Sequence, residues 1–181
     1  MEPAKTLSFA PIDHPDPRVQ RVGFDLTDPY VERCWSAVVG PTSTLLLRRL
    51  PTLWVDRVPA EIDACELSQS LGVGAGVSDR SRIMSTLDRL ARFGLARPAV
   101  DGAGLDVYRQ VPPLSPRQLE RLPAWTRDTH EHLFGAHLDQ VDDLARRQQQ
   151  AASITSRMDR LQHSPSHRSP ALRAPGQALG R

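Results

Sequence analysis

The sequence predicts a mostly helical fold with one small β-hairpin. Helix starts, in which a capping side chain precedes apolar residues at helical spacing, recur through the middle of the chain. A single stretch, residues 95–111, alternates apolar and polar side chains around an Asp-Gly turn, as a hairpin does. The length of 181 residues indicates one domain with extensions.

Composition excludes several classes of protein. Basic and acidic residues nearly balance, at 23 and 21, so the chain is not polycationic. Lys5 is the only lysine, so all the other basic residues are arginines. We attribute this excess of arginine over lysine to coding bias rather than to function. No apolar run approaches the roughly 18 residues of a membrane-spanning helix. Two cysteines, Cys34 and Cys65, are too few for a disulfide framework, and the N-terminus lacks a secretory pattern, so we expect a cytoplasmic protein.

Four segments are expected along the chain. Residues 1–27 contain four prolines and little periodicity, which predicts an irregular N-terminal arm. Residues 28–114 form the folded domain, and residues 115–162 form a C-terminal helical segment. Residues 163–181 are rich in Pro, Ser and Arg, and we expect a disordered tail.

Helices account for the first half of the domain. Asp28-Pro29 is a favourable helix start, and this helix is expected to run to about Val39. The run Gly40-Pro41-Thr42 ends it and begins a strongly apolar helix, which we expect to be the core helix, bent or ended in its first part by Pro51. Asp63 then caps a short helix over residues 64–71.

The second half adds a longer helix and the hairpin. A glycine-rich loop, residues 72–77, follows a helix rather than a strand, so we interpret it as a turn and not as a nucleotide-binding loop. Ser78 or Asp79 caps the next helix, predicted over residues 80–93, and the hairpin follows. An apolar helix, a short helix, a longer helix and a hairpin in this order are typical of a winged helix-turn-helix.

The helix over residues 80–93 is predicted to have two opposite faces. Ile83, Leu87 and Leu90 share an apolar side, while arginine and serine side chains share the other. The major groove of DNA admits one helix, and Arg and Ser can contact base edges or phosphates there. We expect Arg82, Ser85 and Arg89 to contact bases, and Arg80 and Arg92 to contact phosphates. The candidate DNA-binding residues are Arg80, Ser81, Arg82, Ser85, Arg89 and Arg92.

An ordinary surface helix would show the same two faces. Its arginines could pair with neighbouring acids, Asp88 with Arg92 and Asp79 with Arg82. Residues 61–115 contain six arginines and seven acidic residues, which is not a basic stretch. The alternatives to a DNA-binding regulator are therefore a winged-helix module that docks another protein, and a replication or partition factor of a mobile element.

Two runs resemble known proteins: residues 40–50, GPTSTLLLRRL, and residues 87–96, LDRLARFGLA. They are similar to winged-helix regulators of the MarR and similar bacterial groups, and to uncharacterised proteins of high-GC actinobacteria and their mobile elements. The resemblance covers residues 28–114, about half of the chain. It implies DNA-binding transcription control, usually by a homodimer.

The C-terminal segment is predicted to be helical and to join two copies of the chain. Ser115-Pro116 begins a helix, and a long helix is expected from about residue 124. We expect a homodimer through residues 124–162; the alternative is a helix that folds back onto its own domain.

The sequence gives no indication of catalysis or of a bound cofactor. His130, His132 and His137 lack the spacing of a metal site, and we expect them to be exposed helical residues. The serines, histidines and acids form no recognisable catalytic set. We therefore expect neither an enzyme nor a metal or cofactor site.

Overall fold

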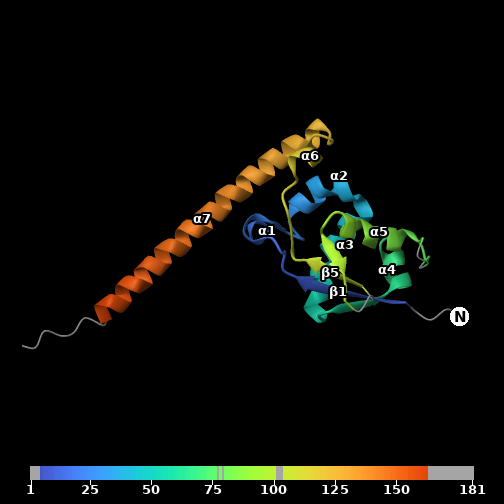
Figure 1. The fold of residues 1–181 in the computed structure, drawn as a ribbon, viewed down its shortest axis with the longest axis horizontal. Helices are drawn as coiled ribbons and strands as arrows, with labels where there is room; N and C mark the ends of the chain where they lie inside the picture. The colour runs from blue at the N-terminus through green and yellow to red at the C-terminus, as the bar shows by residue number, and fades with distance from the viewer. Residues whose placement is uncertain (1–4, 77, 79, 101–103, 163–181) are drawn as a thin grey trace, which may run out of the picture. The chain divides into compact units, whose positions relative to one another are not determined.

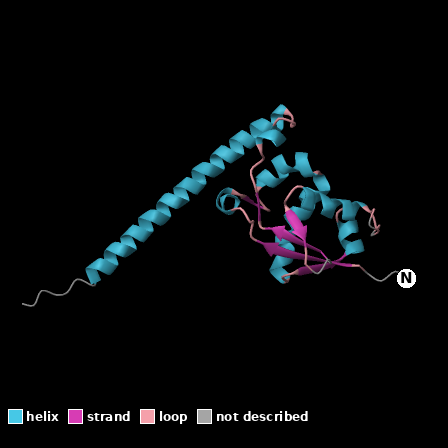
Figure 2. Ribbon diagram, viewed as in Figure 1, coloured by secondary structure: helices cyan, strands magenta, loops and turns pink. Residues whose placement is uncertain are grey.

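The computed structural model describes residues 5–76, 78, 80–100 and 104–162 (Figure 1). The chain divides into two compact units, Met1–Val141 and Asp142–Arg181. The expected mostly helical fold is confirmed (Figure 2), but the strands form a four-stranded and a two-stranded sheet instead of a single hairpin. The predicted tail over residues 163–181 and the predicted turn at Asp101-Gly102 lie outside the described residues.

The first unit contains all the described strands. Its elements in chain order are β1 (Thr6–Ile12), α1 (Pro17–Val22), β2 (Phe24–Asp25), the π-helical turn η1 (Val31–Trp35), α2 (Ser36–Val39), α3 (Pro41–Asp56), β3 (Ala60–Asp63), α4 (Ala64–Ser70), α5 (Arg82–Arg92), β4 (Ala96–Pro98), β5 (Gly104–Tyr108), β6 (Gln110–Val111) and α6 (Pro116–Leu119). The last helix, α7 (Ala124–Gln162), begins in this unit and continues into the second.

The main sheet has the strand order β3-β1-β5-β4. β4 and β5 pair antiparallel, which confirms the predicted hairpin. β1 lies beside β5 and runs parallel to it, and on its other side it pairs antiparallel with β3 (Figure 1). Every second residue of a strand faces the same side, and Leu7 and Phe9 of β1 are accordingly buried.

The prediction of an irregular arm over residues 1–27 is therefore wrong for β1, α1 and β2. Two of its prolines occupy positions that regular structure tolerates: Pro11 lies near the end of β1, and Pro17 begins α1 after the capping Asp16. Phe24 is also buried. This segment supplies part of the core rather than an appendage to it.

The parallel contact between β1 and β5 requires glycine at position 104. Gly104 lies opposite Ser8, and a Cβ atom at position 104 would collide with the backbone carbonyl of Ser8. At this end of the pairing the two strands can therefore approach only because β5 has no side chain there.

The helix starts agree with the sequence, with one correction. Asp63 accepts hydrogen bonds from the backbone N–H groups of Cys65 and Glu66, at 2.9 and 3.0 Å, and caps α4 as predicted. α3 begins at Pro41 as predicted, but it continues through Pro51 to Asp56. α5 begins at residue 82 instead of 80, because its cap is Ser81 and not Ser78 or Asp79.

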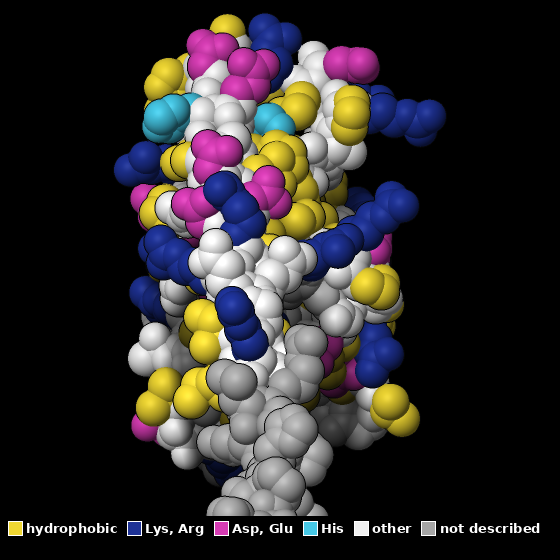
Figure 3. Space-filling view, turned by 90° about the vertical axis from the view of Figure 1, so that its left-hand side faces the viewer, with side chains coloured by type: hydrophobic (Ala, Val, Ile, Leu, Met, Phe, Trp, Pro, Cys, Tyr) yellow, Lys and Arg dark blue, Asp and Glu magenta, His cyan; other side chains and the backbone are white. Residues whose placement is uncertain are grey.

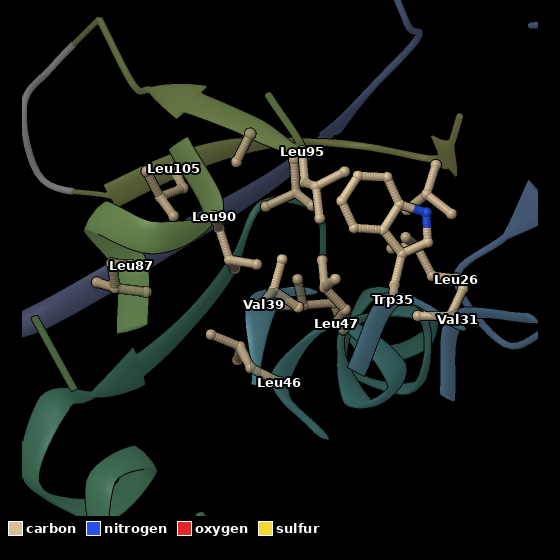
Figure 4. Close-up of a cluster of buried hydrophobic side chains, with 14 of the residues drawn as sticks. Leu26, Val31, Trp35, Val39, Leu46, Leu47, Leu87, Leu90, Leu95 and Leu105 are labelled. Atoms are coloured by element: carbon tan, nitrogen blue, oxygen red, sulfur yellow. The ribbon is translucent and has the colours of Figure 1, made fainter. Parts of the chain in front are cut away.

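The core lies between α3, α5 and the inner face of the sheet. Leu90 of α5 points toward Val39 and Leu46 (Figure 4), and Leu87 and Leu47 belong to the same buried cluster. Trp54 of α3 donates its indole N–H to the carbonyl oxygen of Phe9 at 3.0 Å, which ties the end of α3 to β1. The helices and β1 thus share one hydrophobic core.

The first turns of α7 pack on this unit through a cluster of rings. The hydroxyl of Tyr30 lies 2.6 Å from Nδ1 of His130 and accepts the backbone N–H of Leu114 at 2.9 Å. Phe24 stacks on Tyr30 with ring centroids 3.8 Å apart, and His137 lies against Phe24. The expectation that His130 is exposed is wrong, because it is only 7% exposed.

The burial of His130 predicts that acid destabilises this unit. Burial lowers the pKa of His130 below its ordinary value of about 6.5, and the charge of Glu131 opposes that shift only in part. As the pH falls through about 6.5, the unfolded chain takes up the proton first, so the free energy of unfolding decreases. We expect this decrease between about pH 7.5 and 5.5 in urea titrations, and a smaller one in His130→Gln. His132→Gln, an exposed control, should keep the wild-type pH dependence, and identical profiles for the two variants would contradict this role.

Phe9→Ala tests whether β1 belongs to the core. Phe9 is 0% exposed, so its truncation should lower the free energy of unfolding by about 3–5 kcal/mol. Val55→Ala, at a position 83% exposed, should change it by less than about 0.5 kcal/mol. Chemical denaturation measures both, and equal stabilities would show that β1 is dispensable.

Candidate nucleic-acid interface

α5 has an apolar face and a polar face, as the sequence predicted. Ile83, Leu87 and Leu90 are buried. On the opposite side, the side chains of Arg82, Ser85, Asp88, Arg89 and Arg92 are exposed. The 3.6-residue period of the helix produces this division, and the packing on α3 determines which face points outward.

The arginines of α5 are not neutralised by carboxylates within the described part of the chain. The ion pairs there lie elsewhere and include Arg48 with Glu32, Arg57 with Glu61, and Arg97 with Asp106. The alternative pairing of Asp88 with Arg92 does not occur among the described residues. Asp79, the other acid considered, lies outside them. The guanidinium groups of α5 are therefore accessible to an external acceptor.

The six candidate DNA-binding residues occupy different environments. Arg82, Ser85 and Arg92 lie on the outer face of α5, whereas Arg80 precedes the helix and is exposed. Ser81 is partly buried, and its hydroxyl accepts the backbone N–H of Met84 at 3.4 Å. The structure thus gives Ser81 a capping role at the start of α5.

Arg89 reaches toward the junction of α2 and α3. Its Nη1 atom donates to the carbonyl oxygen of Val39 at 3.4 Å and lies next to Gly40. The guanidinium is therefore held beside the first turn of α3. This placement differs from the direct contact with a base edge that the sequence predicts for Arg89.

A small cavity lies between the first turn of α3 and the polar face of α5. Its volume is about 240 Å³. The residues around it combine the backbone of one helix start with the side chains of another helix. They are Val39, Gly40, Pro41, Thr42, Ser43, Val73, Arg82, Ser85, Thr86 and Arg89.

Sequence reasoning missed the contribution of α3 to this cavity. The available signal was the helix start itself, Gly40-Pro41, which provides no side chain that can cap the first turn. The approach of α5 to this start could not be inferred, because it depends on the packing of residues about 40 positions apart in the chain.

The charges of the molecule are mixed. Figure 3 shows arginine and carboxylate side chains interspersed over the face that it draws. The formal net charge of the whole chain is +2. Any attraction to a polyanion therefore depends on local groups such as those of α5 and not on the overall field.

Other chemistry has little support in the described residues. No group of three or more His, Cys, Asp or Glu side chains among them is placed to hold a metal ion. Burial raises the pKa of the Cys34 thiol to about 11, so this cysteine stays protonated at neutral pH. None of the described helices combines the length and apolar character needed to cross a membrane.

Comparison of the chain with protein-family models, with curated proteins and with solved structures finds no match. The arrangement of α5 and its neighbours is therefore the basis for a functional proposal.

Proposed function

We propose that the protein binds double-stranded DNA in a sequence-specific manner and regulates transcription. In this proposal residues 28–114 form a winged helix-turn-helix domain. The order of their elements supports it: helix α3, strand β3, helices α4 and α5, and the β4–β5 hairpin. Folds of this kind place their recognition helix in the major groove, and α5 occupies the corresponding position in the order.

The exposed polar face of α5 is the observation that supports DNA binding most directly. The major groove is about 12 Å wide and accepts a helix of about 10–12 Å diameter. Arg82 and Ser85 would contact base edges or nearby phosphates, and Arg80 and Arg92 would contact the backbone on either side. Guanidinium groups suit both tasks because they donate two parallel hydrogen bonds.

Docking of another protein is the second candidate function. The near-neutral charge of residues 61–115 favours it, and so does the hairpin, where Asp106 lies 3.0 Å from Arg97. A replication or partition factor would use α5 on DNA in the same way as a regulator. Binding experiments with DNA distinguish a DNA-binding protein from a protein-docking module directly.

Arg82→Ala combined with Arg89→Ala tests the DNA-binding proposal. A duplex is first selected from a random-sequence pool with the wild-type chain, and its affinity is then measured by fluorescence anisotropy. Each lost arginine contact should weaken binding by about 1–3 kcal/mol, so the double variant should lose at least about 30-fold. Arg57→Ala, whose arginine pairs with Glu61 away from α5, is the control and should bind like wild type.

Failure to enrich any duplex, together with no binding to bulk DNA at low salt, would overturn the proposal in favour of protein docking. Binding of DNA by the wild-type chain should also weaken as the salt concentration rises. The negative slope of the logarithm of the association constant against the logarithm of salt concentration should become shallower by about 0.9 for each phosphate contact removed.

We also propose that the protein is a homodimer joined through residues 124–162. In the second unit α7 exposes Leu144, Ile154 and Met158. Leu144, Ala151 and Met158 follow one another at intervals of seven residues, so they lie along one side of the helix. Exposed apolar residues in such a row suit a matching helix of a second copy.

Ile154→Glu is expected to weaken this dimer. A charge on the apolar side would have to be buried without a partner, so the sedimentation coefficient should shift toward that of the monomer. Gln149→Glu changes an exposed residue on another side of the helix and should sediment like wild type. A wild-type chain that sediments as a monomer at all concentrations tested would refute the homodimer.

A further inference from the structure

We propose that the cavity between α3 and α5 binds a single phosphate group. The groups that would hold it are the backbone N–H groups of Thr42 and Ser43, the Ser43 hydroxyl and the guanidinium of Arg89, with Arg82 beside them. The inference deepens the proposed function, because a phosphodiester of a bound duplex would be the natural occupant.

The first turn of α3 supplies free N–H groups. Gly40 offers no capping side chain and Pro41 has no N–H, while the N–H of Thr44 bonds to the carbonyl oxygen of Gly40 at 3.1 Å. The N–H groups of Thr42 and Ser43 have no acceptor among the described residues. α3 is 16 residues long, so its dipole adds partial positive charge at this end.

Ser43 provides an independent indication of a ligand. Its residue surface is only 2% exposed, and it lines the cavity. Within the described part of the chain its hydroxyl has no hydrogen-bond partner, whereas the hydroxyl of neighbouring Thr44 donates to the carbonyl oxygen of Gly40 at 3.0 Å. Ser43 Oγ is not among the fully buried unpaired atoms of the described residues, which are Ser68 Oγ and His137 Nε2, so this hydroxyl opens into the cavity and is available to a ligand there.

The charge around the cavity selects an anion. Arg82 and Arg89 line it, and its described lining includes no carboxylate. Arg89 is already oriented by its contact with the carbonyl oxygen of Val39, so little conformational freedom is lost when it binds. A tetrahedral oxyanion can accept hydrogen bonds from N–H, O–H and guanidinium donors together.

The size of the cavity limits the ligand to a small group. Its volume of about 240 Å³ is below the roughly 300–1,000 Å³ of pockets that enclose drug-sized molecules. A phosphate group therefore fits better than an enclosed nucleotide. The group could belong to a DNA backbone lying against α5 or to a free phosphate, and both share the chemistry described.

Nuclear magnetic resonance of the intact chain tests the site with inorganic phosphate, at the ionic strength of a chloride reference. The amide signals of Thr42 and Ser43 should shift saturably with phosphate and not with chloride. Ser43→Ala should weaken phosphate binding by about two- to tenfold, and Arg89→Gln by about tenfold or more. Ser68→Ala is the matched control, because Ser68 is also buried with an unpaired hydroxyl but lies in α4, away from the cavity.

A second titration, with a duplex, identifies the source of the phosphate. If the duplex shifts the same two amides and competes with inorganic phosphate, the ligand is a backbone phosphodiester. If phosphate shifts them but no duplex binds, the site holds a free phosphate, and the DNA-binding proposal fails while this one stands. If the duplex binds elsewhere and phosphate leaves both amides unmoved, or if Ser43→Ala and Arg89→Gln behave like Ser68→Ala, the phosphate site is refuted.

Discussion

The packing of α5 on α3 determines most of what this protein presents to its surroundings. Leu87 and Leu90 are removed from water only when the apolar side of α5 faces the core. That requirement turns the arginines outward and simultaneously brings Arg82 and Arg89 next to the first turn of α3. The polar face and the cavity are therefore two results of the same hydrophobic contact, and a change in this packing would alter both.

Local signals in the sequence were sufficient for much of the fold. The Asp63 cap, the Gly40-Pro41 helix start and the hairpin were predicted because neighbouring residues specify them. The strand β1 was missed because its partners, β3 and β5, are distant in the sequence. The prolines of residues 1–27, judged alone, indicated irregular structure. Similarly, nothing near His130 indicates that Tyr30, a hundred positions earlier, buries it.

The candidate site divides in the same way. The exposed arginines of α5 follow from helical periodicity, so sequence alone places them on one face. Their surroundings depend on tertiary structure: the capping role of Ser81, the contact of Arg89 with Val39 and the unpaired hydroxyl of Ser43 all became apparent only in the folded chain. Periodicity identifies which residues face outward, but it does not show what they meet there.

The central position of β1 also has a consequence for biosynthesis. The ribosome makes β1 before the other described strands, yet its parallel partner β5, in which Gly104 aligns with Ser8, is made only after the long stretch of chain between them. Until then the main-chain polar groups of β1 have no neighbour on that side. Closing so long a loop is slow relative to forming local helices, so the nascent helices are expected to collapse first and the sheet to be completed last.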